Sequence, residues 1–107
     1  MRPIPPAMRE KLAQEPRMKV CALSGLGRAY GGCSGGIEWD HVWIYAGKQI
    51  NELWAIIGVC KGHHKAKDGN RVVKDAICIA SLKLAKPADL AKYPRKNWDQ
   101  IKKSLCL

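Results

Sequence analysis

The sequence contains no phenylalanine, and aromatic residues make up only 7% of its 107 positions. A domain of this length buries only part of the surface that its unfolded chain exposes. The large apolar side chains are those of four tryptophans and of aliphatic residues, which are scattered among glycine and lysine. We therefore expect a single domain over residues 1–107, with a thin hydrophobic core that needs an additional staple.

Long apolar segments are also missing. The longest clean apolar run, residues 53–60, is far short of the roughly 20 residues that span a bilayer, and the opening MRPIPP has no apolar stretch typical of a secretory signal. These absences predict a cytoplasmic protein without a membrane partner, whose five cysteines are reduced. In a reducing compartment, neighbouring Cys and His residues indicate metal binding before disulfides.

Acidic residues are few. Nine Asp and Glu stand against nineteen Lys and Arg, which gives a net charge of +10. Such an excess attracts a polyanion at long range, and nucleic acid is the first class of partner to consider. A basic protein without that partner has the same composition, so the motifs must decide between the two interpretations.

The pattern of apolar residues predicts an α+β domain in which a β-hairpin lies between helices. β-Branched and aromatic residues indicate a strand over 37–45, a turn over 46–52 and a returning strand over 53–59. Helices are expected over 6–14, 61–67, 72–85 and from Asn97 onward, with Pro16 and Pro87 as terminators. The glycine-rich segment 20–36 is too irregular for either element and is typical of backbone folded around a bound group.

A Cys-x-x-His step, Cys60 and His63, stands at the predicted junction of strand and helix. A two-residue gap lets both side chains turn onto one tetrahedral metal, and Cys21 and Cys33 upstream could complete a Cys₃His zinc site. The zinc knuckle then comprises residues 21–33 and 60–63. The alternative is that the cysteines are buried reduced thiols, which pack as small hydrophobes. We interpret Cys78 and Cys106 as such buried thiols, because neither has a ligand residue beside it in the sequence.

The three histidines of the chain lie in or beside the predicted hairpin and short helix, in the order Asp40-His41, Asn51, His63-His64. This order resembles the HNH, or ββα-metal, nuclease family, in which a strand carries Asp-His, a loop carries Asn, and a second strand runs into Cys-x-x-Cys-His at the head of a helix. The match covers residues 38–67. His63 stands in place of the second knuckle cysteine, and Asn51 lies further before Cys60 than is usual in the family.

The resemblance implies a ββα-metal centre over 37–70 and hydrolysis of DNA. The helices expected at both ends of the chain, at the C-terminal end over 72–107, would cover this centre. His41 would be the general base that activates water, and Asn51 would orient its imidazole. Asp40 and His64 would hold a Mg²⁺ or Mn²⁺ ion. A neutral imidazole suits the base, and mixed oxygen and nitrogen ligands suit several divalent ions.

Local geometry restricts these assignments. Neighbouring helical residues project about 100° apart, so His63 is expected to bind the structural zinc and His64 the catalytic ion. Neighbouring strand residues face opposite ways, so Asp40 and His41 can serve one phosphate only if the strand bulges or ends there.

Basic residues that follow or flank the predicted short helix are candidates for contacts to DNA phosphates, namely Lys61, Lys65, Lys67, Arg71 and Lys74. For any one of them, a solvated basic surface is the alternative. The functional alternatives are a zinc-stabilised nucleic-acid-binding module without catalysis, and a nuclease of the same fold that acts on junctions or RNA. Either a monomer or a homodimer is compatible with the sequence, and the small size suggests a phage or prophage member.

Overall fold

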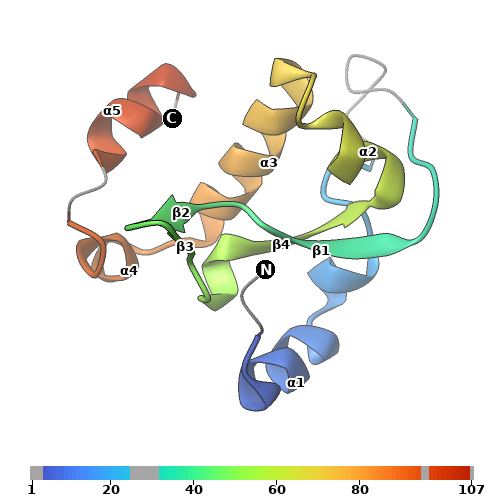
Figure 1. Cartoon of the computed structure of the whole chain (residues 1–107), viewed down its shortest axis with the longest axis horizontal. Coiled ribbons are helices and arrows are strands. Elements are labelled where there is room, and N and C mark those ends of the chain that lie inside the picture. The colour runs from blue at the N-terminus through green and yellow to red at the C-terminus, as the bar shows by residue number, and fades with distance from the viewer. Residues whose placement is uncertain (1–3, 25–31, 95–96, 107) are drawn as a thin grey trace.

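A pair of antiparallel strands crosses the middle of the molecule, and the helix that follows lies at one end of the pair (Figure 1). β1 (Ile37–His41) pairs with β4 (Ile56–Cys60) in a register that places Ile37 opposite Cys60. α2 (Lys61–Ala66) begins at the next residue. The computed structural model describes residues 4–24, 32–94 and 97–106. The predicted order of strand, strand and short helix is therefore observed.

The first strand is shorter than predicted. β1 ends at His41, where the Val42 N–H donates to the carbonyl of Ala55 (3.0 Å). The chain then forms a second hairpin from β2 (Ile44–Tyr45) and β3 (Lys48–Gln49). Its turn residues Ala46 and Gly47 both have positive φ (52° and 79°), as a tight two-residue hairpin requires. One strand over 37–45 was thus a wrong prediction, because strand-forming composition does not reveal where pairing stops.

The return of the main hairpin also differs from the prediction. Residues 53–55, expected as strand, form the 3₁₀ turn η3 (Leu53–Ala55), and β4 begins only at Ile56. All five residues of β4 are buried. Ile57 and Val59 pack with α3, whereas Ile56 packs with Leu12 and Met18. A strand buried on both faces reads as a continuous apolar run, which is why periodicity could not place its start.

An N-terminal arm supports the opposite face of β4 (Figure 1). It consists of α1 (Pro6–Gln14), with the predicted bounds, and the 3₁₀ helix η1 (Pro16–Lys19). Arg17 donates to the carbonyls of Ile56 (2.7 Å) and Leu53 (2.6 Å). A Cβ atom on Gly58 would lie 3.1 Å from the Met18 Cα, so glycine permits the close approach of η1 to the strand.

Three helices complete the described chain. α3 (Arg71–Leu84) lies within one residue of its predicted bounds and is capped by the side chain of Asn70. α5 (Trp98–Ser104) begins after the predicted cap Asn97, whose Oδ1 accepts from the N–H of Gln100 (3.3 Å). α4 (Pro87–Ala91) was not predicted, because Pro87 was interpreted only as a terminator. Proline also suits the first turn of a helix, and here it starts one.

The core has an aromatic part and an aliphatic part. Trp98 meets Trp43 and Trp54 edge to face at ring-centroid distances of 5.3 and 5.9 Å. Leu82 and Leu90 pack into the same cluster, whereas β4 and α3 supply the aliphatic part beside Cys21 and Cys60. The described residues thus form an α+β domain, and three of the four tryptophans gather at one place rather than spreading along the chain.

The two remaining cysteines behave differently. Cys78 is buried in the aromatic cluster, and burial raises the pKa of its thiol, as expected for a structural cysteine. Cys106 is exposed just after α5. Its interpretation as a buried thiol was wrong, because it follows the end of α5 at Ser104 and belongs to none of the core clusters of the described residues.

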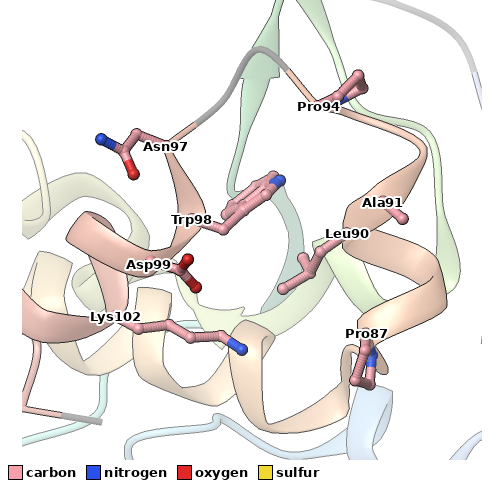
Figure 2. A pocket seen from close by; sticks show the side chains of 8 residues that line it. All are labelled: Pro87, Leu90, Ala91, Pro94, Asn97, Trp98, Asp99 and Lys102. Carbon is pink, nitrogen blue, oxygen red and sulfur yellow. The ribbon is translucent and has the colours of Figure 1, made fainter.

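A pocket of about 480 Å³ opens between α4 and α5 (Figure 2). Leu90 and Trp98 point toward each other at its centre, and Lys102 lies at its border. It is lined by Pro87, Leu90, Ala91, Pro94, Asn97, Trp98, Asp99 and Lys102, none of them a predicted site residue. In the part of the chain that the structure describes, no helix has the length and apolarity needed to cross a membrane.

Ser81 joins the aromatic cluster to η3 and yields a test of this packing. Its fully buried hydroxyl accepts from the Trp43 indole N–H (2.9 Å) and donates to the Trp54 carbonyl (2.7 Å). Ser81→Ala removes both bonds and should lower the free energy of unfolding by about 1–3 kcal/mol. Ser104→Ala, at an exposed serine of α5, is the matched control. Equal denaturation midpoints for the two variants would contradict the role of Ser81.

Candidate metal centre and active site

Four side chains converge beside the start of α2, and their ligand atoms all lie within 4.8 Å of one another: Cys21, Cys33, Cys60 and His63. The His63 Nδ1 lies 3.3, 3.8 and 3.2 Å from the sulfurs of Cys21, Cys33 and Cys60. Tetrahedral zinc, with its usual bond lengths to sulfur and nitrogen, separates such ligand atoms by roughly 3.6 Å. This Cys₃His group can therefore hold a metal ion such as zinc.

Local structure aims two of these ligands. Cys60 is both the last residue of β4 and the N-cap of α2. Its sulfur accepts from the backbone N–H groups of His63 (3.3 Å) and Ser34 (3.4 Å). His63 follows three residues later, so the first turn of the helix returns its imidazole to Cys60.

The other two ligands come from the segments on either side of residues 25–31. Ala22 donates to the Gly58 carbonyl (2.9 Å), which aligns the neighbouring Cys21 with β4. Beyond Cys33, Gly62 donates to the Ser34 carbonyl (3.0 Å). Gly35 has a φ of +77°, and a Cβ there would lie 2.8 Å from the Lys61 Cβ. Glycine is thus required for this loop to approach α2.

Two thiols of this group, Cys33 and Cys60, have pKa values shifted in opposite directions. Burial acts to raise the pKa of Cys60, but hydrogen bonds from His63, Ser34 and the other thiols outweigh it and lower that pKa from 9.0 to about 7. Desolvation and the neighbouring Cys21 and Cys60 raise the pKa of Cys33 to about 11. Three thiolates in contact repel one another, and a divalent cation removes that repulsion.

A second group gathers around Asp40, whose side chain is 4% exposed. Its Oδ1 lies 3.4 Å from the His64 Nε2 and 2.5 Å from the Lys67 Nζ. The His64 Nδ1 lies 2.8 Å from the Oε1 of Glu38. The Asp40 Oδ2 is buried, and the described residues give it no hydrogen-bond partner. A carboxylate oxygen in that position is costly unless a cation or donor reaches it.

His41 and Asn51 form a separate pair. The His41 Nε2 lies 2.7 Å from the Asn51 Oδ1, although Asn51 precedes Cys60 by more residues than the family pattern has. The η3 turn takes up the extra length between Asn51 and β4. The sequence required that the strand bulge or end at Asp40 and His41 if both are to serve one phosphate, and β1 does end at His41. The structure thus brings together Asp40 with His64 and His41 with Asn51.

The predicted phosphate-binding residues divide into two kinds. Four are exposed on α2 and α3: Lys61, Lys65, Arg71 and Lys74. Arg71 also pairs with Asp75 at 3.7 Å. Lys67, by contrast, turns inward to Asp40, and its side chain is 22% exposed. The sequence predicted Lys67 only as a contact to DNA phosphate and did not predict this ion pair with Asp40.

Sequence reasoning also missed Glu38 as a site residue. Glu38 precedes Asp40 by two residues on β1, so both carboxylates face α2. Lys67 follows His64 by three residues, a spacing that places the two on neighbouring positions of a helix face. These two periodicities were visible in the sequence and could have indicated both contacts.

Comparisons with protein-family models, with curated proteins and with solved structures gave no match. The resemblance to HNH nucleases therefore depends on the residues and their geometry alone. The Cys₃His group is compatible with zinc whatever reaction the chain performs.

The metal centre gives a direct test by elemental analysis. Purified protein should contain one zinc per chain, and Cys60→Ala should lose the metal and much of the stability, because folding and metal binding are coupled. Cys78→Ala removes another buried thiol and should keep the zinc. Absence of zinc from the wild type, or full zinc occupancy in Cys60→Ala, would contradict the assignment.

The lowered pKa of Cys60 predicts the pH dependence of metal binding. Its thiolate is present above about pH 7, and protonation below that value competes with the metal, so zinc affinity should fall as the pH drops through 7. Competition with a chelator on the folded, zinc-loaded protein should show an affinity that falls more steeply below about pH 7 than above it. An equal slope on both sides of pH 7 would contradict this prediction.

Proposed function

We propose that the chain is a divalent-metal-dependent endonuclease that hydrolyses DNA phosphodiester bonds, with His41 as the general base. The proposal is carried by two side-chain pairs whose members on β1, Asp40 and His41, are consecutive residues at the end of the strand. Asp40 faces His64, and His41 faces Asn51. Hydrolysis of a phosphodiester needs an activated water and a cation for the developing negative charge, and each pair fits one of these needs.

The Asp40 and His64 pair fits a catalytic cation. The separation of 3.4 Å between the Oδ1 and Nε2 atoms is close to that of two neighbouring ligands on one small divalent ion. Glu38 engages the Nδ1 of His64, as carboxylates commonly do for metal-binding histidines, and so directs the Nε2 toward Asp40. The unpartnered Asp40 Oδ2 offers a further ligand atom. When bound there, Mg²⁺ or Mn²⁺ would neutralise charge on the scissile phosphate.

The His41 and Asn51 pair fits a general base. With the Asn51 Oδ1 accepting from the Nε2–H of His41, the lone pair is on Nδ1, which can take the proton of an attacking water. The bond also fixes the tautomer and the orientation of the ring. His41 has no place in the Cys₃His group, so its proposed duty is separate from the structural metal.

The exposed basic residues on α2 and α3 supply the proposed contacts to DNA. Lys61 and Lys65 lie on the helix that carries His64, and Lys74 lies on the helix after it. Together with the net charge of +10, they favour binding to the phosphate backbone with little dependence on sequence.

A zinc-stabilised nucleic-acid-binding module without catalysis is the second candidate, favoured by the Cys₃His group. Such a module needs neither the buried Asp40 nor the orienting bond between His41 and Asn51. A nuclease of the same kind that acts on junctions or RNA shares the whole site. Substrate comparison, rather than the site geometry, separates that version from a DNA nuclease.

The deciding experiment is a plasmid cleavage assay with Mg²⁺ or Mn²⁺. His41→Ala should remain folded, keep its zinc and bind DNA, whereas cleavage should fall by roughly 10² to 10⁴-fold, the usual loss for a positioned base. Asp40→Asn and His64→Ala should also stop cleavage, but excess Mn²⁺ should partly restore it only in these two.

Asp99→Asn is the control, because it removes an exposed carboxylate from α5. Near-normal cleavage by folded His41→Ala would overturn the mechanism. Wild-type protein that binds DNA but cuts neither DNA nor RNA with any divalent ion would establish the binding module instead.

A further inference from the structure

The ammonium group of Lys67 pairs with the Asp40 carboxylate, which is also a proposed ligand of the catalytic ion. Its Nζ lies 2.5 Å from the Asp40 Oδ1, the same oxygen that lies 3.4 Å from the His64 Nε2. The side chains of Asp40 and Lys67 are only 4% and 22% exposed. The pair is thus largely removed from water. The attraction between opposite charges is stronger in such a place than at the surface.

This position distinguishes Lys67 from the other basic residues of the region. Lys61, Lys65 and Lys74 are exposed, and Arg71 is engaged by Asp75 on its own helix. Lys67 is the C-cap of α2, which sets it one helical turn beyond His64 and on the side that faces β1. A contact to DNA phosphate would therefore require Lys67 to release Asp40.

A divalent ion at Asp40 and an ammonium group on the same oxygen repel each other. Because little water screens them, the repulsion weakens ion binding for as long as the ammonium stays in place. The flexible four-carbon stem of lysine allows the ammonium to move without a change in the backbone. A DNA phosphate beside the ion offers it another anionic partner.

From these contacts we infer that Lys67 is a positioning residue that competes with the catalytic ion for Asp40 in the absence of DNA and moves to a phosphate when DNA binds. The inference rests on the proposed function, since it takes Asp40 and His64 as the ligands of the ion. DNA then strengthens ion binding through Lys67. By thermodynamic reciprocity, the ion strengthens DNA binding by the same factor.

The first arm of the test measures ion binding without DNA. Mn²⁺ is titrated into the full-length, zinc-loaded chain, and free Mn²⁺ is followed by electron paramagnetic resonance. Lys67→Met removes the charge and keeps an apolar stem, so it should bind Mn²⁺ roughly tenfold more tightly than the wild type, a change within the usual range of couplings. Lys83→Met removes an exposed charge from α3, at a residue with no proposed part in either site, and should leave the affinity within about twofold.

The second arm repeats the titration with a short DNA duplex, in a His41→Ala background that keeps the DNA intact. DNA should raise the Mn²⁺ affinity of the His41→Ala protein and of its Lys83→Met version equally. The gain should be several-fold smaller with Lys67→Met, because the competing ammonium is already gone. Lys67→Gln is the substitute if Lys67→Met does not fold, and Lys67→Arg should retain the coupling because it retains the charge.

The outcomes separate this inference from the proposed function. Equal Mn²⁺ affinities in wild type and Lys67→Met, or weaker binding in Lys67→Met, would overturn the inference alone. If Asp40→Asn binds Mn²⁺ like the wild type, or if neither wild type nor Lys67→Met binds it, the ion is not held by Asp40 and both proposals fail.

Discussion

Cys60 has three structural duties, and both candidate sites depend on its position. It ends β4, caps α2 and supplies the sulfur nearest to the His63 imidazole. Because the helix begins at the residue after the strand, its first turn is fixed relative to the sheet. That fixed turn directs His63 to the thiols and the next residue, His64, toward the carboxylates of β1. A shift of one residue at this junction would rotate both side chains by about 100° and remove at least one of them from its partners.

The two parts of the core support this junction from different sides. The aliphatic residues of β4 and α3 pack beside Cys21 and Cys60, and the tryptophan cluster holds the segment after β1 through Trp43. His41 is the last paired residue of β1, two residues before Trp43. A small chain without phenylalanine thus combines a compact aromatic cluster with a candidate metal staple, as its limited buried surface requires.

Local patterns predicted much of the fold. Pro6, Asn97 and the period of α3 placed three helices closely, because caps and helical spacing depend on neighbouring residues. The end of β1 and the start of β4 depend on pairing between distant residues, and no spacing in one strand contains that information. The ligand set was accessible through its residue types, whereas the engagement of Asp40 by Lys67 depends on how α2 sits against β1.

The burial of Asp40 is not explained by the stability of the fold alone. Its carboxylate is nearly buried, one oxygen lacks a hydrogen-bond partner among the described residues, and Lys67 neutralises the other. Burial of a charged pair seldom stabilises a fold more than apolar packing would, and an unsatisfied oxygen adds to the cost. Departures of this kind from local consistency are expected at functional sites. A cation on the Asp40 carboxylate would offset this cost, so a feature that packing alone does not explain suits the proposed chemistry.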